Sequence, residues 1–151
     1  MEKKGFTLVE IILVLGVISL LAVLAVPNIS IFSRRLILKG EVNRLVSNLR
    51  RARQYSTKGE EKWGLVFYSE EDKYKLVRNK GNPKKEKVIK LEAGVGMERV
   101  TFPYLAEKRA VFFKELGSLV TGIGRVVLKA GPEKREVVIS SNAGEINVRA
   151  N

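Results

Sequence analysis

The sequence contains no cysteine and no histidine. Without cysteine the chain cannot form disulfide bonds, use a thiolate nucleophile or build a cysteine-ligated metal centre. Without histidine it lacks imidazole bases and the ligands of most zinc sites. We find no carboxylate or lysine constellation that replaces them. We therefore expect a protein that is not an enzyme and that holds no metal or other cofactor.

Two remaining patterns fall short of a binding motif. The glycine-rich stretch 117–124 superficially resembles a phosphate loop, but it lacks the Lys-Ser/Thr pair and precedes a predicted strand. The acidic residues 70–72 lack the spacing and the closing glutamate of a calcium loop. The sequence therefore predicts a turn at the first position and an acidic hairpin tip at the second.

Positive charge is in surplus, with 28 Lys and Arg against 16 Asp and Glu and a net charge of +12. Most of it lies in two segments. Residues 28–58 hold eight basic side chains against Glu41, and residues 73–90 hold eight against Glu86. Such a surplus indicates an anionic partner, which could be a nucleic acid, an anionic lipid or an acidic protein surface.

A long apolar run begins near the start of the chain. It extends from Phe6 to Val26 and is closed by Pro27. As a helix it would span about 31 Å, the thickness of the hydrocarbon core of a bilayer. Lys3 and Lys4 precede the run, which predicts a cytoplasmic N-terminus and an exported remainder.

Glu10 is anomalous because it places a carboxylate inside this apolar run. A charged residue in a membrane helix costs about 2.5–3.5 kcal/mol on insertion scales. The run contains no Lys, Arg or His that could compensate the charge. The partner is therefore best sought on another chain, where a free amino terminus near Phe6 would supply a compact cation.

Three interpretations of the N-terminal segment compete. The first is a cleaved secretory signal peptide, with residues 23–25 as the cleavage box, and the second is a plain membrane anchor. Neither explains a charge near the start of the apolar run. The third interpretation is a prepilin signal, which depends on a specific resemblance.

The start of the apolar run resembles the class III signal of type IV pilins and type II secretion pseudopilins. The matching residues are Gly5-Phe6-Thr7-Leu8-Val9-Glu10, followed by the apolar run. The resemblance implies that a prepilin peptidase cleaves between Gly5 and Phe6 and methylates Phe6. It also implies that Glu10 pairs with the amino terminus of an adjacent subunit, and that Pro27 kinks the helix.

The remainder of the chain predicts an amphipathic helix followed by short strands. Leu38, Val42, Leu45, Leu49 and Ala52 recur at helical spacing and form one apolar stripe. From residue 63 onward, period-two patterns and turn residues alternate. The strands are expected at 63–68, 74–77, 88–91, 99–102, 110–113, 125–128, 136–139 and 145–148, with a loop at 79–83.

These elements predict an α+β fold, in which a long N-terminal helix packs on a compact antiparallel β domain, as in pilins. The helix would have a transmembrane half and an amphipathic half. The expected segments are a leader at 1–5, a transmembrane helix at 6–27, an amphipathic helix at 28–57 and an exported β-rich domain at 60–151.

The second half of the chain resembles the GspH/FimT domain. The resemblance rests on Phe113 and Gly117, the strand at 125–128, the Gly144-led final strand, and the segment Leu49-Arg50-Arg51-Ala52-Arg53. It implies a minor pseudopilin of a type II secretion system, with a single-pass anchor in the inner membrane and a periplasmic domain. The partners would be a prepilin peptidase and other pseudopilins or pilins, in a fibre that supports protein export.

The alternative is a FimT-like minor pilin that binds DNA during natural transformation. A basic surface with the stacking aromatics Trp63 and Tyr74 would suit DNA, and it would use Lys84, Lys85, Lys87 and Lys90. The simpler interpretation is that the aromatics pack in a core and the lysines are solvated. In DNA-binding members an arginine-rich stretch follows the C-terminal glycine, whereas here Glu145 follows Gly144.

Overall fold

The computed structural model describes residues 5–59, 61–78, 86–105 and 107–150, and only the backbone of residues 24–28. The chain divides into two units, Met1–Ser33 and Arg34–Asn151. Its helix and strands are α1 (Leu8–Lys58), β1 (Trp63–Tyr68), β2 (Lys73–Arg78), β3 (Lys87–Lys90), β4 (Gly96–Val100), β5 (Tyr104–Leu105), β6 (Lys108–Phe113), β7 (Gly124–Ala130), β8 (Glu133–Ile139) and β9 (Ile146–Ala150).

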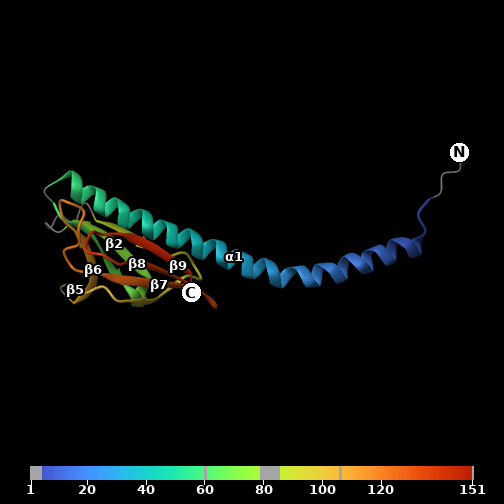
Figure 1. Cartoon of the computed structure of the whole chain (residues 1–151). Coiled ribbons are helices and arrows are strands. Elements are labelled where there is room, and N and C mark those ends of the chain that lie inside the picture. Colours follow the sequence, from blue (N-terminus) through green and yellow to red (C-terminus); the bar gives the residue numbers. More distant parts are fainter. Residues whose placement is uncertain (1–4, 60, 79–85, 106, 151) are drawn as a thin grey trace. The chain divides into compact units, whose positions relative to one another are not determined.

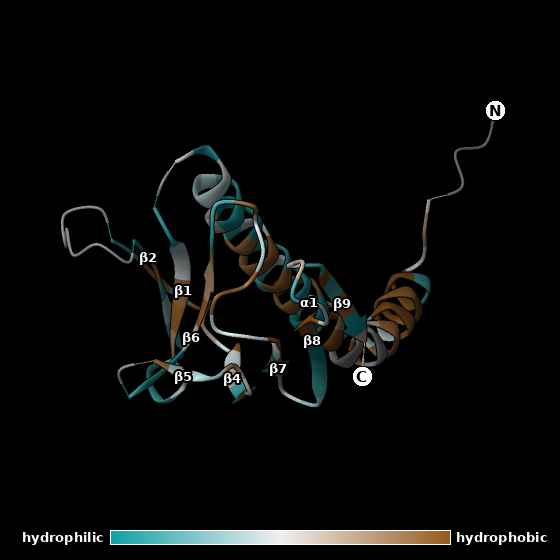
Figure 2. Ribbon diagram, turned by 60° about the vertical axis from the view of Figure 1, so that its left-hand side comes forward, coloured by the Kyte–Doolittle hydropathy of each residue, from teal (hydrophilic) through white to brown (hydrophobic). Residues whose placement is uncertain are grey.

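The first unit contains the N-terminal part of α1. This part of the helix is apolar along almost its whole length (Figure 2). Its described side chains are exposed, and Phe6 and Leu8 are 83% and 75% accessible. Among the residues described, no helix is both long enough and apolar enough to cross a membrane. The predicted transmembrane segment 6–27 includes residues 24–27, whose side chains the structure does not describe. The membrane span and the kink at Pro27 therefore stay predictions.

The second unit begins with the remainder of α1, and the predicted apolar stripe is confirmed there. All five of its residues, from Leu38 to Ala52, are at most 1% exposed. The helical segments expected at 6–27 and 28–57 form one long helix, as the predicted fold requires, because the helical backbone continues through residues 24–28.

Two antiparallel sheets complete the second unit (Figure 1). Sheet A has the order β3-β2-β1-β6-β5, and sheet B has the order β4-β7-β8-β9. The eight strands that the sequence predicts are present, with bounds that shift by a few residues. The two-residue strand β5 was not predicted, and the expected loop at 79–83 lies outside the described residues.

The core lies where α1 and the inner faces of both sheets meet. It takes Leu45 and Leu49 from the helix, Leu65 from sheet A and Leu128 from sheet B, all at 0% exposure. Phe67 and Phe102 stack within it, with ring centroids 5.5 Å apart. Since one continuous core joins the three layers, removing any layer would expose apolar surface of the other two.

The C-terminal end of α1 is fixed to sheet A by a single hydroxyl group. Ser56 is fully buried. Its Oγ donates to the carbonyl of Phe113 at 3.0 Å and accepts the N–H of Trp63 at 2.8 Å. A serine hydroxyl can donate once and accept at the same time. Ser56 therefore positions the start of β1 and the end of the neighbouring strand β6 against the helix.

The acidic segment 70–72 lies at the β1–β2 turn, as predicted. It forms a short 3-10 helix, Ser69–Glu71, and ends at Asp72 in the left-handed conformation with φ of 45°. The Asp72 carboxylate accepts the N–H of Met97 at 2.6 Å, which ties the tip of sheet A to strand β4. Within the described part of the chain, no group of acidic side chains is arranged to hold a metal ion.

Candidate functional site

The residues that resemble a prepilin signal form the start of α1. Thr7 is the residue before the helix, and Glu10 is its third residue. The Thr7 Oγ1 accepts the backbone N–H of Glu10 at 3.3 Å. In return, the Glu10 Oε2 accepts the backbone N–H of Thr7 at 3.3 Å. This reciprocal pair is a capping box, which satisfies two backbone donors that a helix start otherwise leaves open.

The capping box modifies the sequence-based view of Glu10. That carboxylate has neutral hydrogen-bond donors within its own chain, including the Thr7 hydroxyl at 3.4 Å. Among the described residues it has no cationic partner within ion-pair distance. The pairing of Glu10 with the amino terminus of another subunit therefore stays a prediction. The signal that sequence reasoning missed is the Thr-x-x-Glu spacing, which is typical of helix starts.

The residues that resemble the GspH/FimT domain meet at one junction. Arg53, near the end of α1, donates from Nη2 to the carbonyl of Ala143 at 2.9 Å and from Nη1 to that of Gly144 at 3.2 Å. Gly117 and Gly144 adopt φ of 72° and 75°. A Cβ on Gly144 would lie 2.6 Å from the carbonyl oxygen of Gly117. The turns at Gly117 and Gly144 can therefore approach this closely only if glycine occupies these positions. The two glycines of the GspH/FimT resemblance thus have a structural role.

The glycine-rich stretch 117–124 is a turn, as predicted. Its backbone connects β6 to β7, and the N–H of Gly117 donates to the carbonyl of Lys114 at 2.7 Å. Gly122 also has a positive φ, of 105°. The stretch leads into strand β7 and not into a helix, so it lacks the helix N-terminus of a phosphate loop.

Only two of the four basic residues proposed for DNA belong to the described part of the chain, so the proposed basic surface stays a prediction. Lys84 and Lys85 lie outside the described residues, whereas Lys87 and Lys90 are exposed on the edge strand β3. Tyr74 is fully buried, so it cannot serve as the proposed stacking platform. It shares the inner face of sheet A with Leu76, and its hydroxyl accepts a hydrogen bond from Asn48 Nδ2 at 2.9 Å.

Part of the charge in residues 73–90 is compensated locally. Lys73 pairs with Glu71, and Lys75 pairs with Glu86 at 3.5 Å. The ammonium groups of Lys73 and Lys75 also lie 5.1 and 5.6 Å from the centre of the Tyr68 ring. The hydrogen bond from Lys73 lowers the pKa of Glu71 below its ordinary value. Lys73 and Lys75 are thus already engaged by carboxylates and by an aromatic ring of the same domain.

We expect burial of Tyr74 to make the domain sensitive to alkaline pH. Burial raises the pKa of the Tyr74 phenol above its ordinary value of 10.0. The unfolded chain therefore loses this proton at a lower pH than the folded chain, and stability falls as the pH rises from about 10 through the folded pKa. Ultraviolet titration of wild type and Tyr74→Phe tests this, because the substitution should remove the phenol that ionises together with unfolding. An unchanged titration curve would contradict the prediction.

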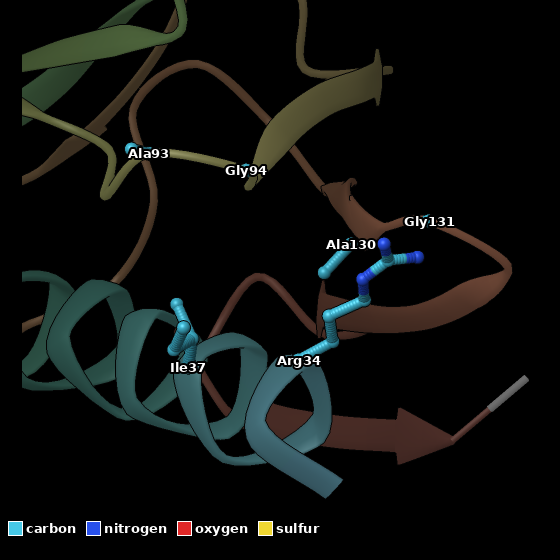
Figure 3. A pocket seen from close by; sticks show the side chains of 6 residues that line it. All are labelled: Arg34, Ile37, Ala93, Gly94, Ala130 and Gly131. Carbon is cyan, nitrogen blue, oxygen red and sulfur yellow. The ribbon is translucent and has the colours of Figure 1, made fainter. Parts of the chain in front are cut away.

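A shallow pocket of about 400 Å³ lies at the start of the second unit. Figure 3 shows Arg34 and Ile37 on α1, facing Ala93 and Gly94 on one side and Ala130 and Gly131 on the other. A Cβ on Gly131 would lie 2.8 Å from Arg34 Nη1, so the arginine side chain covers this turn. The neighbouring Arg35 pairs with Glu133 at 2.8 Å. The pocket is therefore part of the packing between α1 and the β7–β8 turn.

The second unit thus combines the end of a long helix with two antiparallel sheets, an arrangement typical of pilin-like α+β domains. Comparison with family models finds no match, and comparison with curated proteins finds none either. The structure of the minor pseudopilin EpsH, from the type 2 secretion system of Vibrio cholerae, is similar to this chain with a TM-score of 0.59. The similarity covers 75% of this chain and 96% of that chain at 14% identity. The chain therefore has a pseudopilin-like fold.

Proposed function

We propose that the chain is a minor pseudopilin of a type II secretion system. In this proposal a prepilin peptidase cleaves between Gly5 and Phe6, and Phe6 is methylated. The apolar segment 6–27 anchors the subunit in the inner membrane, with the β domain in the periplasm. Glu10 then pairs with the amino terminus of another pilin-like subunit in a fibre that supports protein export.

One observation carries the proposal: a prepilin-like signal occurs in the same chain as a pseudopilin-like fold. The signal is the motif from Gly5 to Glu10, and the fold is that of the similar EpsH domain. The two features rest on separate residues, since the motif lies in the first unit and the hydrophobic core of the β domain lies in the second. A secretory signal peptide or a plain anchor would not require this fold or a carboxylate in the motif.

Mass spectrometry of the mature N-terminus tests the processing step. The full chain is produced together with a prepilin peptidase, and we expect loss of residues 1–5 and a methylated Phe6. The matched control is Gly5→Leu, which should block cleavage without disturbing the fold, since no atom lies within 4 Å of a Cβ at that position. An unprocessed chain, or cleavage near residue 25, would reject the proposal.

A further inference from the structure

A cleft lies where α1 ends beside sheet A. It is an open depression of about 480 Å³ on the surface and is referred to below as the aromatic cleft. The helix contributes side chains from its last two turns, β1 and β2 contribute apolar surface, and β3 contributes a lysine. The lining residues are Arg51, Tyr55, Lys58, Gly59, Glu61, Trp63, Leu76 and Lys87.

Two aromatic rings form the apolar part of the aromatic cleft. Tyr55 and Trp63 have ring centroids 4.9 Å apart and planes inclined by 58°. Tyr55 is 41% exposed, whereas Trp63 packs partly against the core. The hydrogen bond from the Trp63 N–H to the buried Ser56 hydroxyl fixes the backbone at this position. Trp63 is therefore positioned by the core and by its backbone before any ligand arrives, which reduces the entropy lost on binding.

The charge around these rings is positive and largely uncompensated. Arg51, Lys58 and Lys87 form no ion pair among the described residues. The acidic residue of the lining, Glu61, is engaged by Arg78 Nη2 at 2.6 Å. An incoming carboxylate would thus meet three cations that have no ion-pair partner in the described part of the chain, and one carboxylate that already has a partner.

We propose that the aromatic cleft binds an acidic segment of another protein, with an apolar side chain against Tyr55 and Trp63 and carboxylates beside Arg51 and Lys87. Aromatic and arginine side chains are those that contribute most to protein interfaces. A second copy of this chain is disfavoured by its net charge of +12. The binding does not depend on the N-terminal segment, so it stands apart from the function proposed above.

A nucleic acid fits this cleft less well than a peptide. Lys58 and Gly59 lie at the C-terminal end of α1, where the free carbonyl groups give a partial negative charge. A phosphate backbone would bring repeated negative charges to this end and to Glu61. A peptide with one apolar side chain needs only a few carboxylates, and these can be placed beside Arg51 and Lys87.

The single tryptophan of the chain, Trp63, allows a direct test by fluorescence. The full chain in a non-ionic detergent is titrated with the peptide acetyl-Asp-Glu-Leu-Glu-Asp-amide. We expect a saturable change in Trp63 emission that weakens as salt is added. The same peptide with Ser in place of Leu should bind about tenfold more weakly, because it lacks the apolar anchor. Absence of a saturable change would overturn the proposal.

Charge reversal separates a specific site from general attraction. The double variant R51E/K87E should weaken peptide binding about tenfold or more. The matched control K39E/K129E removes the same net charge at exposed positions outside the cleft and should bind as wild type does. Circular dichroism verifies that each variant is folded. Tyr55→Ala provides a second test, because it should weaken peptide binding while it leaves the charge of the cleft unchanged. Equal loss in both double variants would overturn the proposal, as would tighter binding of oligothymidylate that displaces the peptide.

Discussion

Replacement of Glu10 by glutamine is expected to remove the subunit from the fibre while its helix start stays intact. Glutamine can still accept the Thr7 N–H, since a capping box functions with Glu or Gln. It cannot form an ion pair with the amino terminus of a neighbour. Breaking a buried ion pair costs about 3–5 kcal/mol, which lowers an association constant about a hundredfold or more. The recovery of the variant in sheared or pelleted fibres, relative to wild type, measures this.

Two further variants separate the charge of Glu10 from its capping role. Thr7→Val removes the hydroxyl that accepts the Glu10 N–H, and we expect it to weaken the helix start by about 1 kcal/mol with most of the assembly retained. Glu10→Ala removes both functions and should lose at least as much assembly as Glu10→Gln. If Glu10→Gln entered fibres as well as wild type does, the intersubunit ion pair would be wrong and only the capping role would remain.

Replacement of Gly64 by alanine is expected to cause the largest loss of stability in the β domain. Gly64 lies in β1, opposite Val77 of β2 and Phe112 of β6. A Cβ there would lie 2.2 Å from the carbonyl oxygen of Val111 and 2.6 Å from the Phe112 ring. Because backbone on a central strand cannot move without disturbing its neighbours, we expect a loss of about 3 kcal/mol or more in the free energy of unfolding.

The matched control for Gly64→Ala is Gly40→Ala. Gly40 lies inside α1, and no atom is within 4 Å of a Cβ at that position. Alanine is the better helix former, so this variant should gain up to about 1 kcal/mol. Denaturant unfolding of the two variants and wild type therefore gives shifts of opposite sign. A stability of Gly64→Ala equal to that of wild type would show that the strands can separate at this point.

Local patterns predicted the elements of the β domain well. The alternation from Trp63 to Tyr68 gave the bounds of β1 correctly, and the spacing from Leu38 to Ala52 identified the buried face of α1. Such periodicities depend only on neighbouring residues. The strand order of the two sheets was not predicted, because it depends on contacts between distant segments. The strand β5 was not predicted, because two residues are too few to show a periodic pattern.

The sequence indicated some features of the candidate sites but not others. The role of the motif from Gly5 to Glu10 in processing and assembly stays a prediction, whereas the capping box that the structure shows within it was not predicted. Two interpretations of Tyr74 were open, stacking against DNA or packing in the core, and its burial confirms the simpler one. Its period-two relation to Leu76 places both residues on one face of the strand, which already favours the core. The junction around Arg53 joins residues about 90 positions apart, which no local pattern can reveal.

The hydrogen bond from Met97 to Asp72 has a consequence for how the domain avoids unwanted strand addition. Strand β4 is an outer strand of sheet B, and outer strands offer free N–H groups to other chains. The Asp72 carboxylate occupies one such group on β4 and places a negative charge beside it. At the opposite margin of the sheet, β9 is exposed over its last three residues. Within sheet B, intermolecular pairing under conditions that favour aggregation should therefore begin along β9 and not along β4.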